Sequence, residues 1–358
     1  MGQICFFNTA KAWGGGEKWH FEISNYLYEK GHDVFVIAHK ESELLKRLMK
    51  AKIPCKGIAI SNLSFLNPFK YFNLISFFRK SNIDTIVMNL SRDVKIAGPS
   101  AQKSGVKRII YRRGSAIPIK NTLLNRYYFK HIVTEILANS FATKNTVTQN
   151  NDTLFPKEKI TVIYNGIHTQ SITDIDVRKE NKDFTIINLG RLEYQKNQKF
   201  LIHLAALLKE RKIPFKLIIG GEGSLRKELE KLIVELNVQG HVSLEGFIER
   251  PLEFINRADV FVLPSFWEGF GYVLAEAALC HKPIVAFDVS SNPELILDDT
   301  TGYLVEVNDL NAFADKIIGL YQDHELRKRM GEKGHVHIKT NFDKDVQLKK
   351  IEDYLVYG

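Results

Sequence analysis

Two glutamates, Glu268 and Glu276, stand eight positions apart around a Gly-Phe-Gly turn. The apolar run Val260–Leu263 before the turn predicts a strand, and the Ala-rich run Ala275–Leu279 after it predicts a helix. The first amides of a helix have no internal acceptors and carry roughly +0.5 of dipole charge, so the turn predicts a seat for phosphate. Gly269 and Gly271 remove the side chains that would keep a phosphate away from that backbone.

The two carboxylates suit hydroxyl groups on either side of a diphosphate better than they suit phosphate itself. Eight helical residues span roughly 12 Å at about 1.5 Å each, which is comparable to a ribose and a sugar joined by diphosphate. The turn therefore predicts a nucleotide-sugar site. Taken alone, it is equally compatible with an ordinary helix start that carries one dipole-stabilising glutamate and one solvated glutamate.

Other predicted strands also end in cationic or glycine-rich sequence. Gly190–Lys196 follows the strand Thr185–Leu189 and places Arg191 and Lys196 where a doubly wound sheet binds its ligand. Two cations at this point could neutralise a diphosphate, including one that leaves in a transfer reaction. Three further segments follow predicted strands, at the carboxyl edge of the expected sheets. They are Trp13–Glu17, which contains Gly15 and Gly16; Gly220–Gly223, which contains Gly221; and Leu244–Ile248. None has the Gly-x-Gly-x-x-Gly spacing of a dinucleotide fold.

Strand-like apolar runs alternate with helical patterns along the chain, which is typical of parallel α/β units. The expected strands are Ile4–Phe7, Val34–Ala38, Lys56–Ala59, Thr85–Met88, Arg108–Tyr111, Glu135–Ala138, Ile160–Ile163, Thr185–Leu189, Phe215–Ile219, Val242–Leu244, Asp259–Leu263, Pro283–Phe287 and Gly302–Val305. The expected helices are Glu17–Lys30, Glu41–Lys50, Lys70–Arg79, Val94–Lys103, Asn121–His131, Gln198–Glu210, Ser224–Leu236 and Asn341–Tyr357. The fold class is thus expected to be α/β, with two Rossmann-like doubly wound domains facing across a cleft.

Composition narrows the class of protein. With 44% hydrophobic and 25% charged residues, the 358-residue chain suits two globular domains. No run of 18 apolar residues occurs, and Met1 leads directly into a strand without secretory features, so we expect a cytoplasmic protein. The three scattered cysteines have no metal spacing. Asp174-x-Asp176 has the spacing of some metal sites but lies in a polar linker, so no metal is expected.

Charge is unevenly distributed along the chain. Residues 1–170 hold 25 Lys and Arg against 11 Asp and Glu, whereas residues 171–358 hold 25 against 30. The basic half faces an anionic partner, for which nucleic acid, an anionic membrane surface and a phosphorylated substrate all qualify. The aromatic and lysine-rich stretch Leu63–Lys80 favours a membrane surface, although its rings would also suit a buried core helix.

The order of these strand-end motifs resembles that of the retaining glycosyltransferases of family 4, which have the GT-B fold. The resemblance covers roughly residues 160–310, beginning at Val162–Ile167, and is looser in the first half, where Gly15-Gly16-Glu17 is the main match. It implies an acceptor-side domain at residues 1–168, a linker at 169–183 and a nucleotide-sugar domain at 184–340. It also implies a C-terminal helix, residues 341–358, that packs back on the first domain.

The resemblance also assigns roles to individual residues. Arg191, Lys196 and Glu268 become the catalytic group, with the two cations on the diphosphate and the glutamate on the donor sugar. Glu276 accepts from the ribose hydroxyls. The other implied donor contacts are Gly15, Gly16, Gly190, Gly221, Phe247, Ile248, Gly269, Phe270, Gly271, Tyr272 and Val273.

One departure concerns a histidine that many family members place after a first-domain strand. Here the comparable loop reads Tyr111-Arg112-Arg113-Gly114-Ser115 and has no histidine. We therefore expect Arg112 and Arg113, together with Asn165, on the acceptor side.

The predicted function is a metal-independent retaining glycosyltransferase without a cofactor. It would move a hexose-type sugar from a nucleoside-diphosphate sugar, with UDP favoured over GDP, to a saccharide or lipid-linked acceptor. The expected setting is bacterial lipopolysaccharide, capsule or other surface-polysaccharide synthesis, in the cytoplasm or at the inner face of its membrane. One alternative is a nucleotide-sugar-binding protein without transfer activity. A nucleic-acid-binding protein is the other, but no recognised binding motif supports it, so no nucleic-acid partner is expected.

Overall fold

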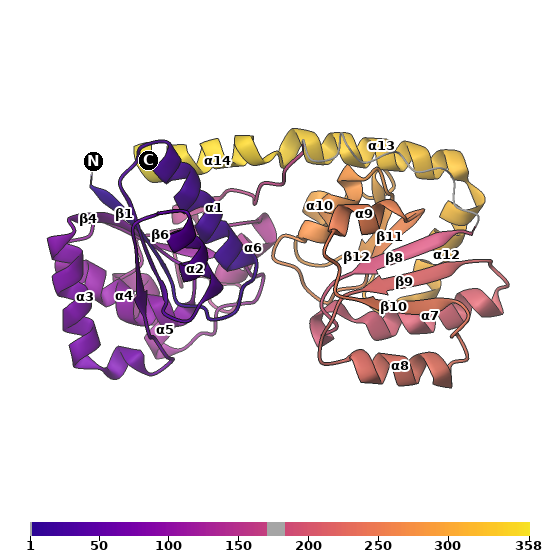
Figure 1. Cartoon of the computed structure of the whole chain (residues 1–358), viewed down its shortest axis with the longest axis horizontal. Helices are drawn as coiled ribbons and strands as arrows, with labels where there is room; N and C mark the ends of the chain where they lie inside the picture. Colours follow the sequence, from indigo (N-terminus) through magenta and orange to yellow (C-terminus); the bar gives the residue numbers. More distant parts are fainter. Residues whose placement is uncertain (1, 170–182) are drawn as a thin grey trace. The chain divides into compact units, whose positions relative to one another are not determined.

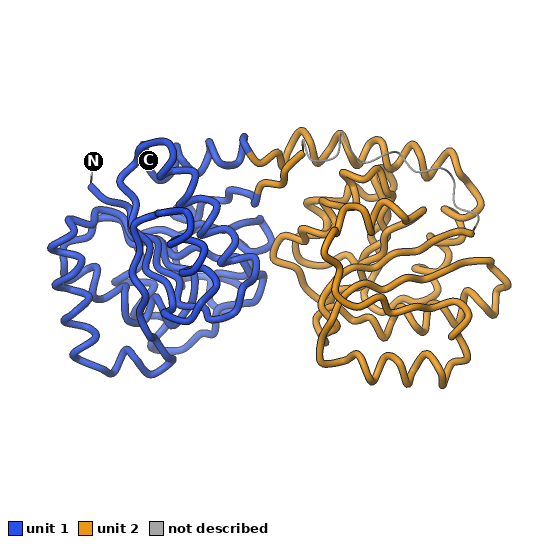
Figure 2. The backbone as a smooth tube through the Cα atoms, viewed as in Figure 1, with its two compact units in different colours: residues 1–165, 345–358 blue, residues 166–344 orange. Residues whose placement is uncertain are grey.

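The protein forms two compact units in a computed structural model that describes residues 2–169 and 183–358. Unit 1 comprises Met1–Asn165 and Asp345–Gly358, and unit 2 comprises Gly166–Lys344 (Figure 2). Most of the expected linker 169–183, including Asp174-x-Asp176, lies outside the described residues.

Unit 1 is built on a parallel seven-stranded sheet in the order β3-β2-β1-β4-β5-β6-β7. Its strands are β1 (Gln3–Asn8), β2 (Val34–His39), β3 (Cys55–Ile58), β4 (Ile83–Met88), β5 (Arg108–Arg113), β6 (Glu135–Ala138) and β7 (Ile160–Val162). Its helices are α1 (Gly15–Glu29), α2 (Glu43–Lys50), α3 (Pro68–Lys80), α4 (Ser91–Ser104), α5 (Leu123–His131) and α6 (Phe141–Thr148), with short 3-10 helices at Ser64–Leu66 and Lys157–Lys159.

Both faces of this sheet are buried because successive strand residues point to opposite sides. Phe7 belongs to the core that α3, α4 and α5 cover, and its neighbour Phe6 belongs to the core beneath α1 and α2. The second core also receives Leu348, Ile351 and Leu355 from the C-terminal segment. That segment consists of α14 (Lys344–Glu352) and a π-helical turn, Asp353–Tyr357.

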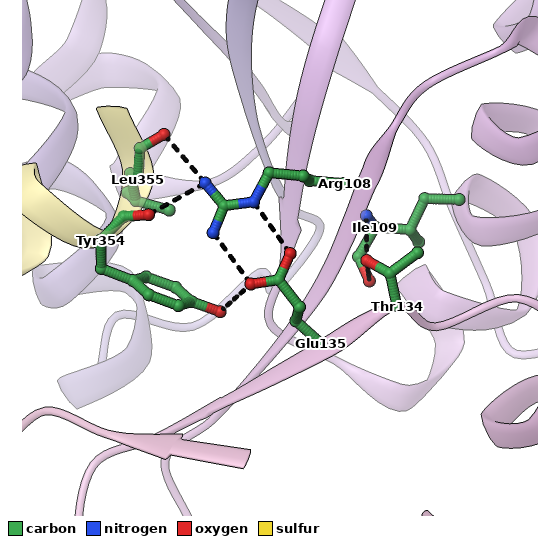
Figure 3. Close-up of polar contacts among 6 residues, drawn as sticks. All are labelled: Arg108, Ile109, Thr134, Glu135, Tyr354 and Leu355. Atoms are coloured by element: carbon green, nitrogen blue, oxygen red, sulfur yellow. Dashed lines mark hydrogen bonds and ion pairs between the residues drawn. The ribbon is translucent and has the colours of Figure 1, made fainter. Parts of the chain in front are cut away.

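Polar contacts at the starts of β5 and β6 also hold the C-terminal segment to unit 1 (Figure 3). Arg108 forms a bidentate pair with Glu135, with both N–O distances at 2.8 Å, and Arg108 Nη1 donates to the Tyr354 carbonyl at 2.9 Å. The Tyr354 hydroxyl donates to Glu135 Oε2 at 2.8 Å. Its bond to Arg108 holds the pKa of Glu135 below its usual range even though burial opposes that shift.

Unit 2 contains a parallel six-stranded sheet in the order β10-β9-β8-β11-β12-β13. Its strands are β8 (Thr185–Leu189), β9 (Lys216–Gly220), β10 (Val242–Gly246), β11 (Val260–Leu263), β12 (Ile284–Phe287) and β13 (Gly302–Val305). Its helices are α7 (Gln198–Glu210), α8 (Arg226–Glu235), α9 (Pro251–Asn256), α10 (Tyr272–Leu279), α11 (Asn292–Leu295), α12 (Leu310–Gln322) and α13 (His324–Asn341), with a 3-10 helix at Tyr194–Lys196.

Helices cover both faces of this sheet as well. The largest core of unit 2 joins α7, α8 and α12 to one face of the sheet, while α9 and α10 contact the other face and α13 packs on α10 (Figure 1). The expectation of two Rossmann-like doubly wound sheets is confirmed. The expected helix Asn341–Tyr357 begins only at Lys344, since Asn341 is the last residue of α13. Helices α6, α9, α11, α12 and α13 were not anticipated.

Candidate active site

The strand order of unit 2 reverses between β8 and β11, because β9 and β10 continue on one side and β12 and β13 on the other. In open α/β sheets, ligands bind beyond the carboxyl ends of the strands at such a switch point. The loop after β8 carries Gly190, Arg191 and Lys196, and the loop after β11 carries Glu268 through Gly271. The fold thus brings the two main predicted motifs to one place.

A side-chain ion pair joins these two loops. Lys196 Nζ lies 2.6 Å from Glu268 Oε1, and both side chains are largely buried, with 13% and 7% of their surface exposed. The backbones are joined too, since Phe266 N donates to Gln195 O at 2.9 Å and Gln195 Nε2 donates to Trp267 O at 2.7 Å. Two of the three predicted catalytic residues are therefore in direct contact, while the third, Arg191, has an exposed side chain.

The glycine-rich loop after β9 packs backbone against backbone with the loop after β8. Gly221 has φ +136°, and a Cβ there would lie 1.9 Å from the Gly190 carbonyl oxygen. Gly221 N donates to Gly246 O at 2.6 Å, which ties the loops after β9 and β10 together. A Cβ at Gly223 would lie 2.3 Å from Leu192 O. These glycines are therefore required for the close approach of three loops around the switch point.

Helix α10 starts at Tyr272, three residues before the Ala-rich run that predicts it. Its N-cap, Gly271, has φ +74°, which favours glycine, and no side chain caps the helix. Tyr272 and Val273 occupy the first turn, and Phe270 is buried just before it. Glu276 is the fifth helical residue and is partly buried. The helix N-terminus on which the sequence analysis places a phosphate thus lies at the switch point.

Phe247 and Ile248, which the resemblance implies as donor contacts, follow β10. Phe247 is 76% exposed, whereas Ile248 is partly buried. Ile248 packs on Gly220, since a Cβ added at Gly220 would lie 2.7 Å from Ile248 Cγ1. Their position at the carboxyl end of β10 puts them at the same edge of the sheet as the Lys196–Glu268 pair, two strands away from β8.

Unit 1 has its own switch point between β1 and β4, and several predicted residues meet there. Gly15 and Gly16 form the first turn of α1, and a Cβ at Gly16 would lie 2.5 Å from Asn89 Nδ2, after β4. Arg112, at β5, donates to Asn89 Oδ1 at 3.3 Å and to Asn165 Oδ1 at 3.1 Å. The structure thus places Gly16 and Arg112 at Asn89, and Asn165 at Arg112.

Arg112 is a buried member of this group. Only 3% of its surface is exposed, and its guanidinium lies 4.9 Å from the centre of the Trp19 ring. A Cβ at Gly114 would lie 2.1 Å from Arg112 Nη1, so Gly114 leaves room for the guanidinium. Arg113 points elsewhere, with its guanidinium 5.7 Å from the centre of the Tyr111 ring. The two adjacent arginines therefore have different surroundings.

Further buried polar residues at this switch point were missed from the sequence. Thr9, after β1, bonds to Asp93 of α4 through both its hydroxyl and its amide, and Arg92 Nη2 donates to Thr9 O at 2.6 Å. Burial raises the pKa of Asp93 to about 7, although its hydrogen bonds to Thr9 oppose that shift. Burial holds the pKa of His20 well below its usual value, and Arg112 lowers it further.

The sequence contained a signal for two residues at this switch point, Asn89 and Arg92. Asn89 and Arg92 follow the apolar run of β4 directly, just as Arg191 follows the run of β8. The same strand-end argument that selected Arg191 would have selected them. Among residues 2–169 and 183–358, no group of three or more His, Cys, Asp or Glu is placed to hold a metal ion.

Comparisons with known proteins identify the family. The sequence profile of "Glycosyltransferase Family 4" matches residues 13–171, and that of "Glycosyl transferases group 1" matches residues 171–337. An uncharacterized glycosyltransferase of Methanocaldococcus jannaschii is 32% identical over 65% of this chain and 63% of its own length. The N-acetylgalactosamine-N,N'-diacetylbacillosaminyl-diphospho-undecaprenol 4-alpha-N-acetylgalactosaminyltransferase of Campylobacter jejuni is 32% identical over 82% of each chain.

Solved structures share the fold across nearly the whole chain. The Anabaena protein Alr3699/HepE in complex with UDP has a TM-score of 0.85 at 19% identity, covering 99% of this chain and 100% of its own. A glycosyltransferase from Rickettsia africae has a TM-score of 0.84 at 20% identity, with the same coverage. The chain therefore belongs to the group 1 glycosyltransferases and is a transferase by class, as the order of its motifs suggested.

Among the described residues, none of the helices combines the length and the apolar character that a membrane crossing requires.

Proposed function

We propose that the protein transfers a hexose-type sugar from a nucleoside-diphosphate sugar, with UDP as the preferred nucleotide, to a saccharide or lipid-linked acceptor. The observation that carries the proposal is the Lys196–Glu268 pair, which joins the loops after β8 and β11 at the switch point of unit 2. A cation beside a helix N-terminus suits the diphosphate, and a carboxylate held by that cation suits the hydroxyls of the adjoining sugar.

The charged donor residues and the first turn of α10 have distinct roles in this proposal. Arg191 and Lys196 would stabilise the departing diphosphate together with the first amides of α10, at Tyr272 and Val273. Glu276 would accept from the ribose hydroxyls. Three Anabaena structures of the same fold contain UDP, UDP and glucose, or UDP-glucose, which supports a uracil nucleotide here.

We further propose that transfer retains the anomeric configuration. The acceptor hydroxyl would attack from the face that the leaving group vacates, without an enzyme nucleophile and without a bound metal. The anomeric coupling constant in the proton NMR spectrum of the product tests this directly. An inverted product would exclude the retaining mechanism while leaving the donor site intact.

Variants of the donor site test the main proposal. Arg191→Ala and Glu276→Ala should each lower donor turnover by more than tenfold, because each removes a charge that contacts the donor. Arg329→Ala and Glu325→Ala on α13 are controls that remove the same charges from exposed positions of the same unit. Calorimetric titration with UDP and product analysis should accompany the turnover assay.

The outcomes separate the two remaining functions. Near-normal turnover by folded Arg191→Ala and Glu276→Ala would reject the donor site. UDP-sugar binding without product on a broad panel of acceptors would instead favour a binding protein without transfer activity.

Unit 1 would hold the acceptor at an anionic membrane surface on the cytoplasmic side, in the synthesis of a bacterial surface polysaccharide. Leu63, Leu66, Phe69 and Phe72 are 69%, 68%, 79% and 64% exposed, in the half of the chain that has excess positive charge. Apolar side chains beside excess positive charge suit reversible binding to anionic lipid.

The structure also corrects part of the sequence argument for this surface. Phe78 is buried, and Phe65 and Phe77 pack against the core, so only some of the rings in Leu63–Lys80 can reach a bilayer. The Lys70 ammonium donates to the Ala59 carbonyl at 2.7 Å and therefore has a structural role.

Vesicle co-sedimentation tests the membrane proposal. The protein should pellet with phosphatidylglycerol vesicles at low salt but not with phosphatidylcholine vesicles. Phe69→Ser combined with Phe72→Ser should lower the bound fraction at least fivefold. Val234→Ser combined with Val336→Ser, at exposed positions of unit 2, should leave it unchanged. A wild-type protein that stays in the supernatant with anionic vesicles would reject this part of the proposal.

A further inference from the structure

A cavity of about 350 Å³ lies within unit 1, beside the switch point between β1 and β4. Ligand pockets in proteins commonly have roughly 300–1,000 Å³, so a small group can enter it. Helix α4, helix α5 and the loop of residues 114–122 after β5 form its walls. We call it the basic cavity, and its polar lining consists of Ser91, Lys95, Arg113, Ser115, Lys120 and Asn125.

The charge of the basic cavity has one sign. Lys95, Arg113 and Lys120 line it, and its described lining contains neither aspartate nor glutamate. It also opens beside the first turn of the 14-residue helix α4, whose dipole favours an anion. The electrostatics therefore select a ligand with negative charge, and three cations suit a phosphate or diphosphate better than a single carboxylate.

Arg113 is held in position and keeps a donor available. Its Nη2 atom donates to the carbonyls of Ser115, at 3.3 Å, and Ile117. Its Nε atom is buried and has no hydrogen-bond partner among the described residues. A buried donor without a partner costs free energy unless an acceptor satisfies it, so Arg113 keeps unused hydrogen-bonding capacity in the wall of the cavity.

The remaining lining of the basic cavity is apolar. Val94, Tyr111, Ile119, Tyr128 and Phe129 contribute to it and are buried in the core of unit 1. A soluble sugar phosphate would gain little from such a lining, whereas carbon atoms next to a phosphate would lose contact with water there.

Exposed apolar side chains lie on the elements that contact α4, which forms one wall of the basic cavity. Helix α4 contacts α5 on one side, and α3 and the 3-10 helix Ser64–Leu66 on the other. Ile117 and Leu123 near α5 are 51% and 82% exposed, and Leu66 and Phe69 are 68% and 79% exposed. An apolar chain that leaves the cavity would therefore meet apolar surface in either direction.

We propose that the basic cavity binds the phosphate group of a lipid-linked acceptor, an amphiphile whose apolar chain leaves the cavity along these exposed side chains. This inference rests on the proposed function, because it identifies the chemical class of the acceptor. Lys95 and Lys120 neutralise the phosphate, Arg113 donates to it, and the apolar lining receives the first carbon atoms of the chain. The saccharide lies on the other side of the phosphate, toward the carboxyl ends of β1 and β4.

Titration calorimetry with farnesyl diphosphate, below its critical micelle concentration, tests this assignment. The full-length protein is first saturated with UDP, so that a free diphosphate cannot enter the donor site. Lys95→Ala combined with Lys120→Ala should weaken farnesyl diphosphate binding at least tenfold. Lys103→Ala combined with Lys157→Ala is the matched control, because both lysines are exposed in unit 1 and neither lines the cavity, and it should leave the affinity unchanged.

Two further ligands separate the phosphate from the chain. Inorganic diphosphate should bind at least tenfold more weakly than farnesyl diphosphate, and farnesol should bind equally to the wild type and the Lys95/Lys120 variant. Unchanged farnesyl diphosphate affinity in that variant would overturn the assignment to this cavity. Equal affinity for inorganic and farnesyl diphosphate would overturn the lipid-linked acceptor.

A different result would reject the proposed function. It fails if UDP does not bind in the first titration or if no sugar is transferred, whereas the affinity for farnesyl diphosphate is measured without turnover. Melting temperatures of both double variants equal to that of the wild type would show that any loss of affinity comes from the cavity and not from unfolding.

Discussion

The two units share one strand order up to the sixth strand but build different sites at the carboxyl ends of their sheets. In unit 2, backbone approaches backbone around Gly190, Gly221 and Gly246, and one ion pair joins the two central loops. In unit 1, Arg112 of β5 joins Asn89, after β4, to Asn165, after β7, in a largely buried polar group. Close packing of backbone on backbone requires glycine at neighbouring positions of the chain. A network of side chains instead joins residues that are far apart in the chain.

This difference explains why one site is easier to find than the other. A loop that needs glycine for close backbone approach has a recognisable glycine-rich run in the sequence, such as Gly220–Gly223. A network such as Arg112, Asn89 and Asn165 is spread over 77 positions of the chain and leaves no local pattern. The comparison predicts that substitutions affect the two units by different mechanisms.

The largest effect is expected at Gly221. Gly221→Ala should lower the free energy of unfolding of unit 2 by more than about 3 kcal/mol, because backbone strain of roughly 1–3 kcal/mol adds to the clash with Gly190 O. Gly240→Ala is the control, since a Cβ there has no atom within 4 Å. Thermal and urea unfolding measure both. Equal stability of the two variants would mean that the loops do not need this close approach.

Removal of Lys196 should have the next largest effect. Lys196→Ala should cost about 3 kcal/mol of stability, because it leaves the largely buried Glu268 carboxylate without its cation. Lys95→Ala in the basic cavity should cost less than about 1 kcal/mol, since it removes a cation–π contact in which the ammonium lies 5.8 Å from the centre of the Phe65 ring. Similar costs in urea unfolding would contradict the distinction between a constrained donor site and an open cavity.

The buried hydrogen bonds between Thr9 and Asp93 in unit 1 should make stability depend on pH. The pKa of this carboxyl rises from 3.8 to about 7 on folding, so the folded protein holds the proton over that interval. The stabilisation is complete below about pH 4 and is lost as the pH rises toward 7. Asp93→Asn should therefore cost about 2 kcal/mol more at pH 5 than at pH 7.

Urea unfolding at both pH values measures this difference, and the same experiment on Asp152→Asn, at an exposed position, accounts for the change in overall charge. A cost of Asp93→Asn that is the same at pH 5 and pH 7 would show that folding does not change the protonation of Asp93.

The smallest effect is expected at the amino ends of β5 and β6, away from the carboxyl ends that carry the sites. Tyr354→Phe should cost about 1.5 kcal/mol, because it removes the hydrogen bond to the charged Glu135 carboxylate (Figure 3). Tyr357→Phe, at a residue that is 71% exposed, should change stability by less than about 0.5 kcal/mol. Farnesyl diphosphate affinity should remain unchanged in both variants, and a loss in either one would mean that the C-terminal segment acts on the basic cavity.

Much of the fold could be predicted because its signals are local. The alternation of apolar runs and helical patterns places the strands correctly to within a few residues, since a buried parallel strand needs a continuous apolar run. The helices α12 and α13 were missed. Helix α13 is an amphipathic helix of 18 residues with few buried positions, so its apolar periodicity is weak.

The candidate site also has features that local sequence predicts and features that depend on tertiary contacts. The sequence by itself determined that strands end in Arg191, Lys196 and Glu268 and that glycines precede α10, because these residues lie beside the elements that position them. Only the tertiary structure decided that Lys196 pairs with Glu268, that Arg112 is buried while Arg113 lines a cavity, and that Phe69 is exposed while Phe78 is not. Those outcomes depend on which strands are neighbours and which helix face is covered, and such contacts join residues far apart in the chain.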